Sequence, residues 1–528
     1  MEKGNQKKVL VLSFLGVITF IAVVVGATYA YFTAQGGGTG NISVNAGTAT
    51  TDNLSFQTGS AISLTANQED FGQGSGNKSG STYARATLTA NNATNNATRN
   101  YYIYLSITSN NFEYTTVDEQ AELLLKVTDP DGTEVTTLGN LERKTSGGVT
   151  GFDITTQTGL ITIADNYEIT STGTVTQDWN IEVIFANLDS DQNDNTGKSF
   201  SATLMIQEEA YEYTLADVCP DGGNLASCIA DLNALAGDGA GNLYYHDADL
   251  ANGAGDNSYR YSGANPNNYV CFGSTESPCP EENLYRIIGV FDDDKDSNYQ
   301  IKLIKSDYTT SAMLGTDGRD YGGTYSNSTS NYKGSMDTST IAAYRWNYDS
   351  SVSSNGSNNW TTSEFNTINL NTNYWNYLGT TWQNLIAETT WHLGGMTTSS
   401  NTAKAFYDGE RGNGVYGSNP TTYSDEIGLM YPSDYGYAAY PDAWTTNLSD
   451  YNNSTITSNN WMYMGLIEWT ITPNSSLSRR VLHVNNNGYL NVNYASNGYA
   501  ARPVFYLKSN VQLEGGSGTS SDPYRLAV

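Results

Sequence analysis

Four cysteines carry the clearest chemical signal in this sequence. They are Cys219, Cys228, Cys271 and Cys279, and successive pairs lie nine and eight residues apart. Because an export signal precedes them, an even count predicts disulfides, for which four thiols allow three connectivities. A zinc site built from all four thiolates is the alternative, but zinc ligands usually lie two to four residues apart. The spacing favours two local disulfides, Cys219–Cys228 and Cys271–Cys279.

An acidic loop offers a second kind of chemistry. Asp189, Asp191 and Asn193 alternate as oxygen ligands do in calcium-binding loops. The sixth position of such a loop should be glycine and is Asp194, and the twelfth should be glutamate and is Phe200. We therefore consider a calcium site here together with its alternative, a solvated hairpin tip.

An aromatic run, MYPSDYGYAAYPDAW, is the third candidate. Tyrosine and tryptophan in loops on a rigid scaffold suit the binding of sugars or proteins. The alternative is that these rings fill the core of a loop-rich domain. The candidate ligand-binding residues are Tyr431, Tyr435, Tyr437, Tyr440 and Trp444.

The remaining acids and histidines give weaker signals. A second acidic row, Asp292, Asp294, Asp296 and Asn298, is better explained as a solvated turn than as a cation site. His246 is followed by Asp247 and Asp249, but it shares no ligand spacing with His392 or His483. We expect all three histidines to be packed or surface residues.

No sequence motif for a known catalytic centre is present. The chain contains no G-x-S-x-G elbow, no H-E-x-x-H, no P-loop and no dinucleotide fingerprint. A glycosidase pair of carboxylates stays open, because its separation is spatial and any of 54 acids could serve.

Composition sets the broad class of the protein. A chain of 528 residues predicts about two or three domains. Its formal net charge of −29 repels phosphate backbones, which excludes nucleic acid as a partner and favours divalent cations. With 39 Tyr and 9 Trp it can bury large cores.

The N-terminal segment has the order of an export signal. Lys3, Lys7 and Lys8 precede an apolar run over residues 9–27, and small residues follow. The best cleavage site is the bond between Ala30 and Tyr31. The alternative is a retained membrane anchor, since the run reaches the length that spans a bilayer. In both cases only residues 9–30 contact the membrane, and the rest of the chain is extracellular or at the cell surface.

Residues 31–210 read as short alternating strands separated by Gly, Asn and Asp turns, which predicts an antiparallel β-sandwich. Expected strands lie at 41–44, 53–56, 61–64, 83–88, 100–108, 123–128, 179–185 and 200–207, and the turn Asp129–Gly132 leads to a return strand at Glu134–Val135.

The segments Gly26–Thr33 (GATYAYFT) and Asn41–Thr48 (NISVNAGT), with the strand at Leu54, resemble the TasA/camelysin family of exported matrix proteins. That resemblance implies cleavage just before Tyr31 and a jelly-roll domain. It also implies self-assembly, because some members lend the new N-terminal segment to a neighbour as a missing strand. Here Gly36–Gly40 (GGGTG) makes such a donor unusually flexible.

Residues 211–528 predict an α+β domain with long loops. We expect a helix at 228–236, a hairpin over 283–305, helices at 364–370 and 382–391, and strands at 426–431, 465–472, 480–484, 488–492 and 501–507. The two capped helices, the Trp469 strand and the segment Gly498–Val504 (GYAARPV) resemble the C-type-lectin-like fold, including variants related to formylglycine-generating enzyme and surface modules of Gram-positive bacteria. The calcium motifs of lectins and the oxidising cysteine pair of those enzymes have no counterpart here.

The sequence thus predicts a mostly β chain: signal or anchor 1–30, β-sandwich 31–210, and C-type-lectin-like domain 211–528. The expected function is that of a non-enzymatic surface or matrix protein, an adhesin or fibre component, binding a glycan or protein ligand without a cofactor unless calcium is one. The alternative is an exported carbohydrate-active enzyme that uses an Asp/Glu pair.

Overall fold

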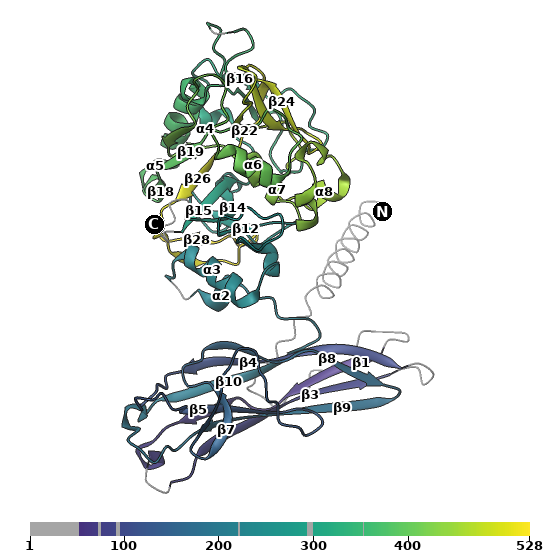
Figure 1. Cartoon of the computed structure of the whole chain (residues 1–528), viewed down its shortest axis with the longest axis vertical. Coiled ribbons are helices and arrows are strands. Elements are labelled where there is room, and N and C mark those ends of the chain that lie inside the picture. The colour runs from purple at the N-terminus through teal and green to yellow at the C-terminus, as the bar shows by residue number, and fades with distance from the viewer. Residues whose placement is uncertain (1–51, 72–74, 91–95, 220–221, 293–298, 352) are drawn as a thin grey trace, which may run out of the picture. The chain divides into compact units, whose positions relative to one another are not determined.

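The computed structural model describes residues 52–71, 75–90, 96–219, 222–292, 299–351 and 353–528. It is mostly β, with 37% of residues in strands and 18% in helices, and every pairing between its named strands is antiparallel. The chain divides into two compact units, the first ending at Tyr211 and the second spanning Glu212–Val528 (Figure 1). The predicted signal, the Ala30–Tyr31 bond and the strand at 41–44 lie outside the described residues.

Unit 1 consists of two antiparallel sheets. The six-stranded sheet has the order β1 (Asn53–Thr58), β3 (Lys78–Thr89), β9 (Thr174–Phe185), β5 (Leu123–Thr128), β7 (Val149–Asp153) and β6 (Arg143–Ser146). The four-stranded sheet has the order β2 (Ile62–Thr65), β10 (Ser199–Gln207), β4 (Ala97–Asn110) and β8 (Gly159–Ser171). Short 3-10 turns lie at η1 (Gln68–Phe71) and η2 (Asn193–Asn195).

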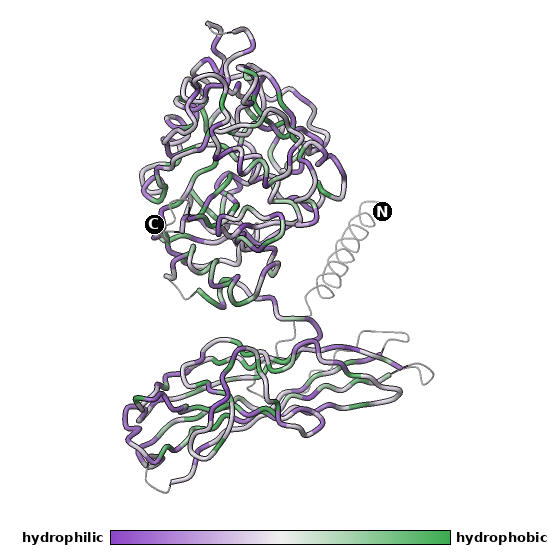
Figure 2. Tube along the Cα trace, viewed as in Figure 1, coloured by the Kyte–Doolittle hydropathy of each residue, from purple (hydrophilic) through white to green (hydrophobic). Residues whose placement is uncertain are grey.

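The two sheets of unit 1 share one hydrophobic core. Along β10 the apolar side chains of Phe200, Ala202, Leu204 and Ile206 are buried, whereas the residues between them are partly exposed. This alternation is the period of two by which a strand presents one face to a core, and Figure 2 shows hydrophobic stretches along the strands of this unit. Across the core, Trp179 Nε1 on β9 donates to the hydroxyl of Tyr101 on β4 (2.9 Å).

The turn predicted at Asp129–Gly132 is present, and its predicted return at Glu134–Val135 is a short antiparallel pairing rather than a full strand. Gly132 has a φ of +81°, and the Asp129 N–H donates to the Thr133 carbonyl (2.9 Å). Beyond the turn an antiparallel bridge joins Thr128 to Glu134, and the Val135 N–H donates to the Val127 carbonyl (2.9 Å).

Unit 2 is built around an antiparallel sheet with several smaller sheets beside it. The main path is β11 (Leu243–His246), β12 (Ser258–Tyr261), β14 (Leu284–Phe291), β15 (Gln300–Lys305), β26 (Val504–Leu507) and β18 (Ile386–Ala387). β13 (Tyr269–Cys271) pairs with β14, and β21 (Ile427–Gly428) pairs with β26.

The smaller sheets of unit 2 are β16 (Tyr321–Thr324) with β17 (Ala342–Arg345) and β25 (Gly498–Tyr499), β19 (Thr389–His392) with β20 (Thr422–Asp425), β22 (Glu468–Pro473) with β23 (Arg480–Val484) and β24 (Leu490–Tyr494), and β27 (Leu513–Gly515) with β28 (Arg525–Leu526). The α-helices are α2 (Leu215–Val218), α3 (Leu225–Ala236), α4 (Ser311–Leu314), α5 (Trp375–Gln383), α6 (Ala403–Glu410), α7 (Pro432–Tyr437) and α8 (Ser454–Ser458). A π-helix, η6 (Phe365–Tyr374), leads into α5, and 3-10 turns lie at η3 (Ala240–Asn242), η4 (Glu281–Asn283), η5 (Trp360–Thr362), η7 (Pro441–Thr445) and η8 (Leu448–Asp450).

One predicted helix of unit 2 is wrong. The sequence predicts a helix over 382–391, but α5 ends at Gln383 and the chain becomes extended. Ile386 and Ala387 pair with β26, and Thr389–His392 pairs with β20, which places Trp391 on a strand. Sheet pairing of a segment rich in β-branched residues outweighs its helical spacing of apolar side chains.

No helix among the described residues combines the length and the apolar character needed to cross a bilayer.

Candidate functional site

The four cysteines form the two predicted local disulfides. Cys219–Cys228 joins the end of α2 to α3, with Cα atoms 5.2 Å apart, and Cys271–Cys279 closes the loop after β13, with Cα atoms 5.9 Å apart. The pairing prediction is confirmed and the zinc alternative is wrong, because no free cysteine is left for a metal. Two disulfides are compatible with an extracellular location.

The candidate calcium residues lie on the exposed loop before β10. Asp189, Asp191 and Asn193 are all exposed, and the Asn193 N–H donates to Asp191 Oδ1 (3.1 Å). Among the described residues, no group of three or more acidic, histidine or cysteine side chains is placed to hold a metal ion. Of the second acidic row, only Asp292 belongs to the described part of the chain.

The aromatic run does not form an exposed patch, which corrects the prediction of a ligand-binding surface there. Tyr431, Tyr435, Tyr437 and Trp444 are at most 2% exposed, and Tyr440 is partly buried. The run folds into α7 and η7, and two of its polar side-chain atoms bond to carbonyls inside the core. The Tyr435 hydroxyl donates to the Gly488 carbonyl (2.7 Å), and Trp444 Nε1 donates to the Ala439 carbonyl (2.9 Å). These rings fill the core, which was the alternative.

The histidines are dispersed through unit 2. His246 and His483 are buried, and His392 is partly buried on β19. His246 Nδ1 accepts the Ala254 N–H (3.0 Å), and burial with the nearby Arg260 charge lowers its pKa well below the usual value. Burial also lowers the pKa of His483, to about 3. Both side chains are therefore neutral near pH 7.

A cluster of buried charges includes Asp434 of the aromatic run, and sequence analysis did not identify it. Asp434 on α7 accepts from Lys302 Nζ on β15 (2.6 Å) and lies 3.6 Å from Arg260 Nη1 on β12. Arg260 also pairs with Asp256 (2.6 Å). Lys302, Arg260 and Asp434 have side chains at most 2% exposed. The one signal of this cluster in the sequence is Lys302, a lysine in the middle of the apolar strand QIKLIK.

Glu410 joins this cluster at the end of α6. The N–H and the hydroxyl of Ser433, the residue before Asp434, both donate to the Glu410 carboxylate. Burial raises the pKa of Glu410 to about 7. Its carboxyl group therefore exchanges its proton near neutral pH, unlike an exposed glutamate.

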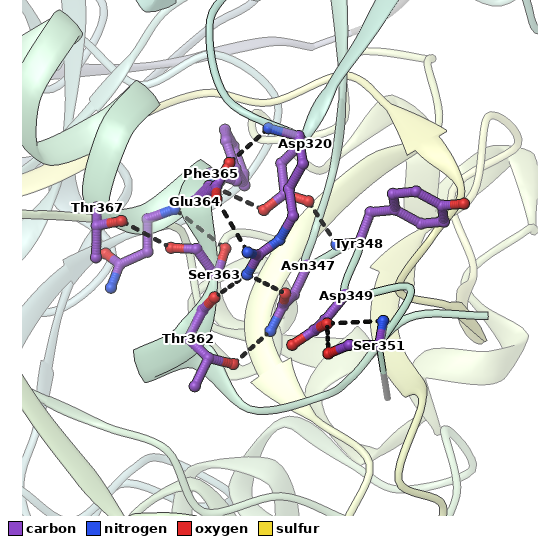
Figure 3. Close-up of polar contacts among 12 residues, drawn as sticks. Asp320, Asn347, Tyr348, Asp349, Ser351, Thr362, Ser363, Glu364, Phe365 and Thr367 are labelled. Atoms are coloured by element: carbon purple, nitrogen blue, oxygen red, sulfur yellow. Dashed lines mark hydrogen bonds and ion pairs between the residues drawn. The ribbon is translucent and has the colours of Figure 1, made fainter. Parts of the chain in front are cut away.

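A second buried carboxylate organises the start of η6. Figure 3 shows Asp320 between the backbones of Tyr348 and Phe365. The Phe365 N–H donates to Asp320 Oδ2 (2.9 Å), and the Tyr348 N–H donates to Oδ1. Burial raises the pKa of Asp320. This carboxylate holds two loop segments against the first turn of the π-helix, which is a structural task.

Asp425 and Glu426 form the candidate carboxylate pair for enzymatic chemistry. They follow each other at the end of β20, both are partly buried, and the Glu426 N–H donates to Asp425 Oδ1 (3.1 Å). Burial and a hydrogen bond with the Glu426 carboxyl group raise the pKa of Asp425 to about 7. A carboxyl group with this pKa can act as a general acid or base near neutral pH.

A set of polar loops presents two of the exposed large apolar side chains of unit 2. Tyr416 is 42% exposed and Leu477 is 49% exposed. Buried Asn358 connects the loops of these two residues. Its amide donates to the Leu477 carbonyl (3.0 Å). Its Oδ1 accepts a hydrogen bond from Asn419 (2.9 Å), which lies in the same loop as Tyr416. We call Asn358, residues 416–419 and residues 474–477 the Asn358 loop cluster.

In unit 1 the notable feature is β10, which has two strand neighbours of unequal length among the described residues. β4 pairs with β10 from Phe200 to Gln207, whereas β2 pairs with β10 only from Ser199 to Ala202. Ala202 lies opposite Ile62, the first residue of β2. The chain before Ile62 belongs to β1 in the other sheet, so β2 does not continue beside residues 203–207. Within the described residues, residues 203–207 of β10 therefore pair with a strand on one side only. We call this stretch the β10 edge.

The β10 edge combines a single described strand partner with a complete core face. Leu204 and Ile206 are at most 3% exposed, and Thr203, Met205 and Gln207 are partly exposed. A strand edge with one partner offers backbone donors and acceptors to another extended segment. Sequence alternation predicted the strand itself, but the length of its neighbour could not be read from alternation.

Comparisons with family models, with curated proteins and with solved structures give no match for this chain.

Proposed function

We propose that this chain is a non-enzymatic, exported cell-surface or extracellular-matrix protein in which unit 1 assembles and unit 2 presents a ligand-binding surface. The observation that carries the proposal is the β10 edge, where residues 203–207 have one strand partner among the described residues. Two sheets around one core support a jelly-roll-like β-sandwich for unit 1. The mixture of sheets and short helices in unit 2 supports a C-type-lectin-like fold.

The occupant we propose for the β10 edge is the segment 31–51 of a second copy. This segment is the new N-terminus after cleavage before Tyr31, and it contains the predicted strand at 41–44. Added next to β10, it would complete the ladder that β2 leaves at Ala202. Backbone hydrogen bonds give such strand addition its affinity, and alternate side chains give it specificity.

A peptide experiment tests this assignment. A chain beginning at Asp52 is mixed with a synthetic peptide of residues 31–51, and amide hydrogen exchange is followed along β10. We expect the peptide to slow exchange at residues 203–207, where the second ladder would form. A scrambled peptide serves as the control. Binding without added protection in this stretch, or no binding, contradicts the assignment.

For unit 2 we propose the Asn358 loop cluster as the ligand-binding surface, with a glycan or a surface protein as the ligand. Exposed Tyr416 and Leu477 stand on loops fixed from beneath by a buried asparagine. An aromatic ring with polar amides around it suits stacking on a sugar or packing on a protein. Screening the full chain against glycans and extracellular proteins tests the proposal, and the absence of any ligand for unit 2 contradicts it.

A second candidate function, a carbohydrate-active enzyme, is favoured by one observation. Asp425 has a pKa of about 7 beside Glu426, and both groups are partly exposed. If this pair is catalytic, Asp425→Asn abolishes hydrolysis of a glycan that the parent chain cleaves, without changing the melting temperature. A parent chain that cleaves no glycan in the same panel removes this candidate.

A further inference from the structure

The ion pair of Lys302 and Asp434 is enclosed by aromatic rings rather than by water. Lys302 Nζ lies 4.3 Å from the ring centroid of Tyr431 and between 5.2 and 5.7 Å from those of Phe291, Trp391 and Tyr506. The two side chains are 1% and 2% exposed. Removing an ammonium and a carboxylate from water costs several kcal/mol per ion.

We propose that Lys302 and Asp434 condense to an intramolecular amide, which cross-links β15 to α7 covalently. The Nζ atom is already 2.6 Å from Oδ2 of a side chain 132 residues further along the chain. Holding the two reactants in contact replaces a bimolecular encounter, which supplies a large part of the barrier reduction for such a step. This activity is a self-modification and needs no ligand of unit 2.

The step balances without any other reactant. One proton passes from Nζ to a carboxylate oxygen of Asp434 as the nitrogen lone pair attacks Cγ, and a carbon–nitrogen bond forms. The bond from Cγ to the hydroxyl oxygen breaks, and that hydroxyl leaves with one proton from nitrogen as water. No atom changes oxidation state, so neither an oxidant nor a reductant is required.

The groups around Asp434 suit the charge that develops on its oxygens. The Tyr431 N–H donates to Oδ2 (2.9 Å), and Arg260 Nη1 lies 3.6 Å from Oδ1. Fixed donors of this kind stabilise a tetrahedral oxyanion. Because Arg260 also pairs with Asp256 at 2.6 Å, its charge is shared between two carboxyl groups. Glu410 acts as a positioning residue, since its carboxylate holds Ser433 and with it the first turn of α7.

Mass spectrometry of the full chain tests the proposal. After reduction and alkylation of all cysteines, the expected mass is that of the linear chain with four alkylated cysteines less one water molecule. Trypsin should give one branched peptide that joins the segments around Lys302 and Asp434, without cleavage after Lys302. A mass that shows no loss of water, with cleavage after Lys302 and a separate linear Asp434 peptide, overturns the proposal.

Variants show whether these two residues make the bond. Lys302→Met and Asp434→Ala should each restore the missing water and abolish the branched peptide. Lys305→Met is the matched control, because Lys305 is buried on the same strand and its Nζ donates to the Glu282 carbonyl instead (3.1 Å). The control should keep the branched peptide. A water loss that persists in Lys302→Met contradicts the assignment, and if a variant fails to fold, the peptide map of the parent chain still decides.

Discussion

Arg502 and Glu468 form a doubly bonded ion pair in the interior of unit 2. Arg502 Nε lies 2.8 Å from Glu468 Oε1, and Nη2 lies 3.0 Å from Oε2. The side chains are 0% and 2% exposed. The same Nη2 also donates to the Met462 carbonyl (2.7 Å), so this pair ties β22 and the segment before β26 to the loop that precedes β22.

We predict that breaking this pair is strongly destabilising. Arg502→Met leaves the Glu468 carboxylate buried without its counter-charge, which should lower the free energy of unfolding by about 3–5 kcal/mol. The control is Lys404→Ala, because Lys404 pairs with Asp408 on an exposed helix face and such pairs contribute about 0–1 kcal/mol. Urea denaturation followed by tryptophan fluorescence measures both, since every tryptophan except Trp179 lies in unit 2. Equal effects of the two substitutions would argue against a buried pair.

We predict that His483 makes unit 2 sensitive to acid. Its pKa is about 3 in the folded state and about 6.5 in an unfolded chain, so the folded state binds fewer protons. Stability from this group is complete above pH 6.5 and is lost as the pH falls towards 3, by about 3 kcal/mol near pH 4. His483→Gln should flatten this part of the stability curve.

The contribution of Glu410 to stability changes with pH in the direction opposite to that of His483. The experiment must therefore separate the contribution of Glu410 from that of His483. Its folded pKa of about 7 lies above its unfolded value, so its contribution favours the folded state below pH 4.5 and is lost as the pH rises towards 7. The quantity to compare is therefore the difference between the His483→Gln variant and the parent at each pH. A difference that does not change between pH 7 and pH 4 contradicts the prediction.

We predict that ligand binding by unit 2 depends on the Asn358 loop cluster. Tyr416→Ser should weaken the binding of any ligand found for unit 2 about tenfold or more, because loss of an aromatic anchor typically costs more than 1 kcal/mol. Tyr377→Ser is a matched control, since Tyr377 is 40% exposed but lies on α5. Titration calorimetry with the two variants distinguishes them. A loss of affinity in Tyr377→Ser alone would move the site to α5.

Local patterns predicted the parts of the fold that are decided locally. Alternation identified β10, and short spacing identified the disulfide between Cys271 and Cys279. The hairpin of β14 and β15 followed from two apolar runs on either side of a polar turn. In each of these cases the partner lies close in sequence, or the buried face can be read from one segment.

The features that the sequence did not reveal depend on distant partners. Trp391 lies on a strand because β20 pairs with its segment, although its spacing suits a helix. The aromatic run looks like an exposed loop by composition, but Tyr435 is buried against a carbonyl 53 residues away. Lys302 finds its carboxylate 132 residues further along the chain. No local pattern contains such pairings.

The assembly state of the mature chain tests the central claim most directly. A chain that begins at Tyr31 and one that begins at Asp52 are compared at equal concentration by sedimentation velocity and electron microscopy. We expect the Tyr31 chain to form fibres or long oligomers and the Asp52 chain to stay monomeric, because only the first carries the segment proposed to fill the β10 edge. A Tyr31 chain that remains monomeric under conditions in which it is folded, or equal assembly of the two chains, would contradict the claim.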